Sequence, residues 1–253
     1  MAQARPNIGN QWKRFVYASD IHGDKQDKKA NDVLFSFLKT WQPQIRVCGG
    51  DLWDFRPLRR GADADERRDS MRADFEAGSK WIQTFQATHF LRGNHDERLW
   101  DLAQRGDGVL SDYAISGIGE VSKLMKSLGC RMLPYDRRFG VLRIGKLKMI
   151  HGFAFGVNAA RRQAQTYGSV LMGHAHGIQH VSIEGLENRV GRMCGCLCDL
   201  DMEFERARIA SLVHRHGFAY GVVHETTGLY HVWQAEDING TWVLPSDILV
   251  ISK

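Results

Sequence analysis

The sequence predicts one α/β domain in which two sheets stack on each other and helices cover the outside. Three observations lead to this fold class. Short β-rich runs alternate with amphipathic helical patterns in the first half, β-rich runs dominate from residue 139 onward, and no linker or internal repeat divides the chain. A chain of 253 residues can bury such a core, so the predicted domain covers residues 1–253.

The first half alternates strands and helices. Strands are predicted where short runs of β-branched and aromatic residues occur, and helices where apolar residues recur at a spacing of three to four. In chain order these elements are a strand at 14–19, a helix at 32–41, a strand at 44–51, a helix at 71–85, a strand at 88–93 and a helix at 118–128.

The second half is predicted to be mostly strands. FGVLRIGKLKMIHG, residues 139–152, has two apolar runs about a Gly-Lys pair, which is typical of a hairpin. The other predicted strands lie near 169–172, 178–183, 188–198, 217–224 and 229–234. The β-α-β-α order followed by a β-rich part favours one sheet packed on another.

The composition is that of an ordinary soluble globular protein, with 43% apolar and 25% charged residues. A net charge of +5 and a pI near 9 favour an anionic partner. The N-terminal residues contain no apolar leader segment, and no apolar run is long enough to cross a membrane. We therefore expect a cytoplasmic protein without a membrane partner.

Two local patterns have a structural interpretation. The five cysteines fit reduced thiols, and Cys194, Cys196 and Cys198 would share one face of an extended strand, where buried apolar packing is favoured over metal binding. The segment 56–74 carries nearly balanced arginines and acids, which predicts a solvated helix or lid crossed by ion pairs.

Polar residues able to hold a metal stand where the apolar strands end. The blocks are SDIHGD with Asp20 and His22, GGDLWD with Asp51 and Asp54, GNHD from Gly93, IHG with His151, and MGHAH with His174 and His176. Ligands gather at the carboxyl ends of strands in open α/β sheets. Each block alone is a weak signal, but independent strands ending this way indicate one shared metal site.

The order of these blocks resembles the pattern of the calcineurin-like metallophosphoesterase superfamily, with similarity to small phosphoesterases of bacteria and phages. That pattern is D-x-H, G-D-x-x-D, G-N-H-D/E, a lone His, and G-H-x-H, and all five blocks occur here in order between Asp20 and His176. The resemblance implies a metallophosphatase-like β-sandwich of two mixed sheets flanked by helices.

The resemblance also implies a binuclear metal centre. Its ligands would be Asp20, His22 and His176 for one ion, Asn94, His151 and His174 for the other, and Asp51 between the two. His95 would be the catalytic residue near the substrate, and Asp96 would orient it. Ligands without thiolates suit borderline-to-hard divalent ions, so Mn²⁺ is favoured, with Fe, Zn, Ni and Mg as alternatives.

The chemistry of these residue types also predicts a hydrolase, independently of the resemblance to the family. Two divalent ions about 3.5–4 Å apart stabilise an in-line displacement at phosphorus and lower the pKa of a bridging water toward 7, so a bridging hydroxide is the expected nucleophile. An imidazolium has an ordinary pKa near neutrality and can protonate the leaving oxygen, which is the role expected of His95.

The sequence restricts the class of substrate less than it restricts the metal site. The protein Ser/Thr phosphatases carry an Arg directly after the second Asp of G-D-x-x-D, whereas here Phe55 stands there and Arg56 follows. We therefore favour a phosphodiesterase or nuclease acting on DNA, RNA or a nucleotide. The alternatives are a phosphomonoesterase or protein Ser/Thr phosphatase, and a non-catalytic interaction module on the same fold. HRHGF, residues 214–218, is a candidate substrate-side loop, and a homodimer is left open.

Overall fold

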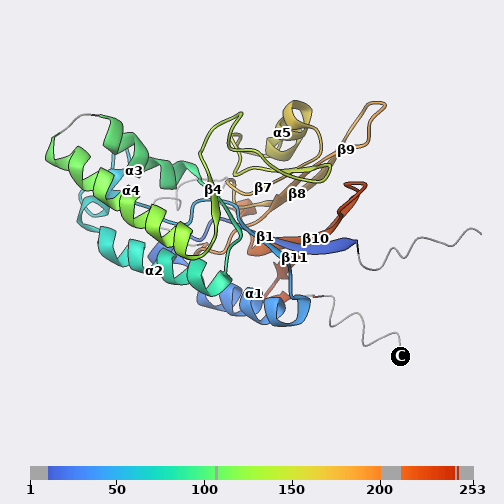
Figure 1. Cartoon of the computed structure of the whole chain (residues 1–253), viewed down its shortest axis with the longest axis horizontal. Helices are drawn as coiled ribbons and strands as arrows, with labels where there is room; N and C mark the ends of the chain where they lie inside the picture. The colour runs from blue at the N-terminus through green and yellow to red at the C-terminus, as the bar shows by residue number, and fades with distance from the viewer. Residues whose placement is uncertain (1–10, 106–107, 201–211, 243, 245–253) are drawn as a thin grey trace, which may run out of the picture.

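Two mixed sheets stack at the centre of the molecule (Figure 1). The computed structural model describes residues 11–105, 108–200, 212–242 and 244. The larger sheet has the strand order β12-β11-β10-β1-β2-β3-β4 and the smaller one the order β5-β6-β7-β9-β8. This arrangement confirms the predicted fold class of two mixed sheets flanked by helices.

The seven-stranded sheet combines a parallel and an antiparallel half. Strands β1 to β4 pair in parallel, and β10, β11 and β12 extend the sheet from β1 in antiparallel fashion. Their bounds are β1 Trp12–Ala18, β2 Ile45–Cys48, β3 His89–Leu91, β4 Arg131–Leu133, β10 Gly217–His224, β11 Tyr230–Ile238 and β12 Thr241–Trp242.

The five-stranded sheet begins with the predicted hairpin, which turns at Gly145. In this sheet β6, β7 and β9 run parallel, whereas β5 and β8 are antiparallel to their neighbours. Their bounds are β5 Leu142–Ile144, β6 Leu147–Met149, β7 Val170–Met172, β8 Ile178–Ile183 and β9 Arg189–Cys194.

Helices cover the outer faces of the sheets. Figure 1 shows α1 to α4 on one side of the seven-stranded sheet and α5 beyond the smaller sheet. Among the described residues, no helix combines the length and apolarity that crossing a membrane requires. The bounds are α1 Lys28–Trp41, α2 Met71–Phe85, α3 Asn94–Gln104, α4 Val109–Ser127 and α5 Ala159–Tyr167.

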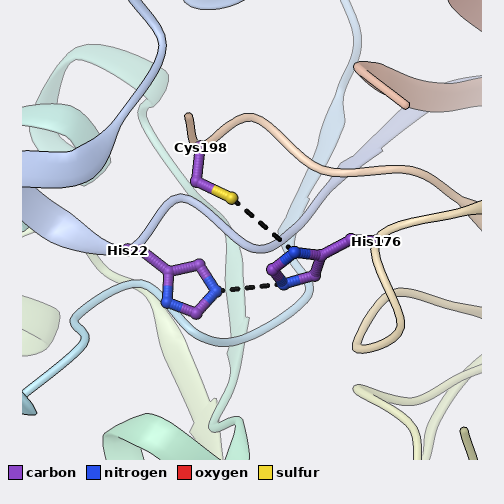
Figure 2. Close-up of side chains that lie close together, drawn as sticks. All are labelled: His22, His176 and Cys198. Atoms are coloured by element: carbon purple, nitrogen blue, oxygen red, sulfur yellow. Dashed lines mark hydrogen bonds between the residues drawn. The ribbon is translucent and has the colours of Figure 1, made fainter. Parts of the chain in front are cut away.

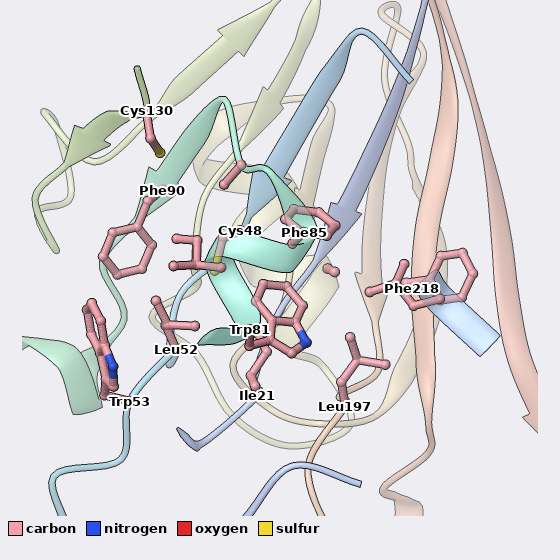
Figure 3. Close-up of a cluster of buried hydrophobic side chains, with 14 of the residues drawn as sticks. Ile21, Cys48, Leu52, Trp53, Trp81, Phe85, Phe90, Cys130, Leu197 and Phe218 are labelled. Atoms are coloured by element: carbon pink, nitrogen blue, oxygen red, sulfur yellow. The ribbon is translucent and has the colours of Figure 1, made fainter. Parts of the chain in front are cut away.

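Residues 15–18 of strand β1 are buried on both faces, which is why they form an unbroken apolar run. Val16 and Ala18 join the core under the helices, where Trp81 and Phe85 of α2 pack (Figure 3). Phe15 and Tyr17 point the other way, into the core between the sheets. Because successive side chains of a strand point to opposite faces, β1 contributes to both hydrophobic cores.

Four of the helices and strands were not predicted, namely α3, α5, β4 and β12. Helix α3 opens with the polar run NHDERLW, which resembles a turn, and α5 is short and carries two adjacent arginines. The helix predicted at 118–128 is the second half of α4. The strand predicted at 188–198 ends at Cys194, because Gly195 takes a φ of 82° that breaks the extended chain.

Candidate metal centre

All seven predicted metal ligands lie at one end of the two sheets. Six are buried and Asn94 is partly exposed. They come from the loops after β1, β2, β6 and β7 and from the first residue of α3, and they are Asp20, His22, Asp51, Asn94, His151, His174 and His176. The site therefore draws on both sheets and assembles only when they stack.

Most of these ligands sit on a strained backbone. Positive φ angles occur at Asp20 (59°), His22 (54°), Asp51 (49°), His174 (74°) and His176 (55°). Side-chain-bearing residues seldom adopt this region, and where they do the strain is often part of a functional site. Backbone hydrogen bonds hold the conformation, since the N–H of Asp20 donates to Gly50 O and that of His22 to Asp51 O, both at 2.9 Å.

Glycines beside the ligands allow the loops to approach closely. A Cβ on Gly93 would lie 2.1 Å from Asp51 Oδ1, and one on Gly173 would lie 2.4 Å from Asp20 Oδ2. Both contacts are too short for any side chain. The glycines of GNHD and MGHAH are therefore required by the packing of the carboxylates.

The first set of facing ligands is the His22 group, made of Asp20, His22, Asp51 and His176. The Nε2 atoms of His22 and His176 are 3.2 Å apart (Figure 2), and Asp20 Oδ1 is 3.4 Å from His176 Nε2. Asp51 Oδ2 lies 4.0 Å from His22 Nε2. Two imidazoles and two carboxylates thus face one point.

The second set is the Asn94 group, made of Asp51, Asn94, His151 and His174. His151 Nε2 lies 3.1 Å from Asn94 Oδ1, 3.1 Å from His174 Nδ1 and 3.3 Å from Asp51 Oδ2. Since Asp51 belongs to both groups, its carboxylate occupies the position expected of a bridge.

The Asn94 group fits a cation. His151 Nδ1 lies 2.9 Å from the carbonyl oxygen of Gly49 and must donate to it, so in a neutral ring Nε2 presents a lone pair. Asn94 Oδ1 and Asp51 Oδ2 face that lone pair, and a cation placed between these acceptors would relieve their mutual repulsion. Burial lowers the pKa of His151, but Asp51 outweighs it and raises that pKa to about 9. The site is therefore built to hold positive charge, as a metal centre must be.

The carboxylates are held ionised for the same reason. Burial would raise the pKa of Asp20, but the hydrogen bond and charge of His176 lower it to about 2. Burial is likewise outweighed at Asp51, whose pKa His151 and His95 lower well below its usual range. By contrast, burial and neighbouring His151 lower the pKa of His174 to about 3, which leaves a neutral ring able to ligate a metal.

His95 stands beside the two groups and is paired with a carboxylate. Its Nδ1 lies 2.5 Å from Asp54 Oδ1, while its Nε2 lies 3.9 Å from Asp51 Oδ2. Arg98 donates to the backbone oxygen of Asp54 at 2.7 Å and to its Oδ1 at 3.2 Å. Burial lowers the pKa of His95, and Asp51 and Asp54 oppose that shift. The ring is thus fixed with Nε2 toward the ligands.

The structure corrects the expected role of Asp96. Its carboxylate accepts hydrogen bonds from the N–H of Gly93 at 2.7 Å and of Trp53 at 3.0 Å, and the side-chain partner of His95 is Asp54. Burial and nearby Asp51 raise the pKa of Asp96 to about 8. Asp96 therefore ties the loop after β2 to the start of α3.

Replacing Asp96 by Ala should loosen this tie. Each buried N–H left without a partner costs about 1–3 kcal/mol, so we expect a loss of at least about 2 kcal/mol in the free energy of unfolding, measured with urea. Metal affinity should fall as well, because the two loops carry Asp51 and Asn94. Asp101→Ala, at an exposed position of the same helix, is the matched control. Unchanged stability with a turnover defect equal to that of His95→Ala would restore Asp96 as a partner of the ring.

The three cysteines do not share one environment. Cys194 packs between the sheets, whereas Cys196 and Cys198 form a small separate cluster beyond Gly195. The Sγ of Cys198 lies 3.8 Å from His176 Nδ1, whereas His22 contacts Nε2 of the same ring (Figure 2). With His22 and His176 it could complete a further ligand group, but His176 Nε2 already faces His22 and Asp20. Cys198 thus contacts the second ring nitrogen of His176, Nδ1, and not the nitrogen that faces Asp20.

A cavity of about 230 Å³ opens over the two groups. Its arginines are paired with acids. Arg56 contacts Asp24, Asp54 and Asp69 and is buried, so it cannot turn toward a phosphate. Arg59 pairs with Glu66, which confirms that ion pairs cross the segment 56–74, although that segment contains only 3-10 turns before α2.

Some cavity residues were missed from the sequence. Arg98 lies within the first turns of α3, and Phe155 belongs to the loop after β6. Of the candidate loop HRHGF, His214 does line the cavity, and its ring centroid is 4.9 Å from that of His176. Its neighbour His216 instead contacts the backbone oxygen of Cys198 at 2.9 Å. Only the first histidine of that loop thus reaches the site.

Comparisons with known proteins agree with this geometry. No protein family model matches the chain. In sequence it is 27% identical over 180 residues to the Gene 54 protein of Mycobacterium phage D29, covering 65% of this chain and 69% of the phage protein. In structure it is similar to Vacuolar Protein Sorting 29 from Cryptosporidium parvum, with 11% identity, 92% and 96% of the two chains covered and a TM-score of 0.51.

A metallophosphoesterase from Sphaerobacter thermophilus is also similar, with 13% identity, 88% of each chain covered and a TM-score of 0.44. The predicted fold of two mixed sheets flanked by helices is thus shared with the vacuolar sorting protein, and in this chain the motif residues lie at the carboxyl ends of strands.

Proposed function

We propose that the protein is a dimetal-dependent phosphoester hydrolase that cleaves phosphodiesters of a nucleic acid or a nucleotide. The observation that carries this proposal is the pair of ligand groups that share Asp51 beside an oriented His95, with members of both groups and His95 lining one cavity. Two divalent ions bound there, with Mn²⁺ favoured over Fe, Zn, Ni or Mg, would activate a water and stabilise charge on the phosphoryl oxygens.

His95 supplies the proton for the leaving oxygen in this proposal. Asp54 accepts the Nδ1 proton, so that Nε2 carries the transferable proton on the side of the ligands. Arg98 in turn holds Asp54. Because burial lowers the pKa of His95, the ring gives up its proton readily once a substrate phosphate has favoured the imidazolium.

The charges of the cavity support a diester over a monoester. Arg56, Arg59 and Arg98 all have carboxylate partners, which leaves little unpaired positive charge for a phosphomonoester dianion. A phosphodiester carries a single negative charge and therefore needs less unpaired positive charge around it. The buried Arg56 and the apolar Phe55 also support a distinction from protein Ser/Thr phosphatases.

The second candidate is a non-catalytic interaction module, which the likeness to a vacuolar sorting protein fits. Retention of every expected ligand favours the hydrolase. We further propose a cytoplasmic location, and a homodimer is left open.

A metal analysis and a parallel assay test the proposal. We expect purified protein to contain Mn, Fe or Zn, and Mn²⁺-loaded protein to hydrolyse bis(p-nitrophenyl) phosphate and DNA faster than p-nitrophenyl phosphate. Single- and double-stranded DNA should be compared, and chelation by EDTA should remove the activity. Negligible metal together with no hydrolysis would favour the interaction module, and a preference for p-nitrophenyl phosphate would favour a phosphomonoesterase.

A further inference from the structure

Phe155 is an exposed aromatic ring at the edge of the cavity. Its side chain is 68% exposed although it lines the cavity, and its ring centroid lies 4.0 Å from that of His174. Monomeric proteins expose single apolar side chains freely, so exposure alone has no meaning. Here, however, the ring stands directly against a residue of the Asn94 group while most of its surface remains exposed.

The loop that carries Phe155 is anchored. Gln179 of β8 donates from Nε2 to the carbonyl oxygen of Gly156 at 3.0 Å and accepts at Oε1 from the N–H of Ala160, also at 3.0 Å. The N–H of Ala159 donates to Gly156 O at 3.0 Å. The phenyl ring is therefore presented at a defined place, as a binding platform must be.

Phe155 and His95 border different parts of the cavity. The His95 ring packs edge-on against His22, with centroids 4.6 Å apart, whereas Phe155 packs against His174. A leaving oxygen protonated by His95 lies at the His22 side. The group that stays on phosphorus then extends toward His174, where Phe155 offers apolar surface.

We propose that Phe155 forms a stacking subsite for the base of the nucleoside that remains on the phosphate. The inference rests on the proposed phosphodiesterase function and narrows its substrate to esters whose retained group bears a flat ring. Aromatic side chains bind bases in this way without selecting sequence, because every base has a π-face.

Two diesters with one leaving group test the subsite. Thymidine 5′-(p-nitrophenyl phosphate) and methyl p-nitrophenyl phosphate both release p-nitrophenolate and differ only in the retained group. We expect Mn²⁺-loaded wild type to prefer the thymidine ester in kcat/KM by roughly tenfold, within the range for a base stacked on an aromatic side chain. Phe155→Ala should remove the preference and leave the methyl ester unaffected.

Matched variants separate stacking from other roles. Phe155→Trp should keep the preference, Phe155→Leu should lose most of it, and Val157→Ala should change nothing, because Val157 is 82% exposed on the same loop and does not line the cavity. Equal losses on both esters in Phe155→Ala would overturn the subsite and make Phe155 a support for His174. A wild type without any preference between the two esters would also overturn it, with the phosphodiesterase intact.

Binding gives a readout that needs no turnover. Calorimetry on Mn²⁺-loaded protein should show that Phe155→Ala binds thymidine 5′-monophosphate roughly tenfold more weakly while binding inorganic phosphate as wild type does. If neither diester is hydrolysed, the proposed function fails, and this comparison still decides the subsite. Unchanged affinity for the nucleotide in Phe155→Ala would contradict it.

Discussion

Asp51→Asn is expected to abolish phosphodiester hydrolysis and to lower the metal content of the protein. Asp51 Oδ2 faces His151 at 3.3 Å and His22 at 4.0 Å, so one carboxylate serves both ligand groups. An amide keeps the shape but loses the charge that balances the cations. Loss of an outer partner of a metal ligand typically costs about 10–100-fold in affinity or activity, and loss of the shared ligand should exceed that.

The experiment measures metal stoichiometry and kcat on the same preparation. Asp32→Asn, at an exposed position of α1, controls for the loss of one charge. In metal-free protein, NMR titration should also show the pKa of His151 falling from about 9 toward its usual value, since Asp51 contributes most to raising it, ahead of Asp20 and the Gly49 carbonyl. A variant with two metals per chain and most of its kcat would refute the shared position of Asp51.

His95→Ala should reduce turnover according to how poor the leaving group is. A sugar alkoxide needs a proton to depart, whereas p-nitrophenolate leaves without help. We expect the kcat/KM penalty on the dinucleotide TpT to be at least about tenfold larger than that on thymidine 5′-(p-nitrophenyl phosphate), which corresponds to about 1.4 kcal/mol of transition-state stabilisation. Metal content should stay nearly intact.

Asp54→Asn is the companion variant, because it removes the charge that holds His95 without removing the ring. It should show the same dependence on the leaving group with a smaller penalty. Equal penalties on both substrates in His95→Ala would mean that the ring binds or orients the phosphoryl group. Loss of metal would place His95 among the ligands, since His22, Asp51 and His95 offer atoms close enough to share an ion.

The gathering of the seven candidate ligands at one place could be predicted from the sequence, whereas the partner of His95 could not. The ligand blocks follow apolar strands directly, and strand ends of a parallel sheet meet at one edge, so order along the chain predicted proximity in space. His95 and Asp96 are neighbours in the chain but lie at the start of α3, where successive residues point about 100° apart. Asp96 therefore turns back to Gly93 while His95 faces the cavity and meets Asp54.

By itself the sequence determined most of the strands, the order of the ligand blocks and the chemistry that such ligands support, because these depend on local patterns of apolar and polar residues. Only the tertiary structure decided that Asp51 faces both groups, that Arg56 is buried among acids and that Phe155 stands open beside His174. Each of those facts depends on the distance between loops from different strands. Such distances are set by how the two sheets pack, and no pattern within a single segment contains them.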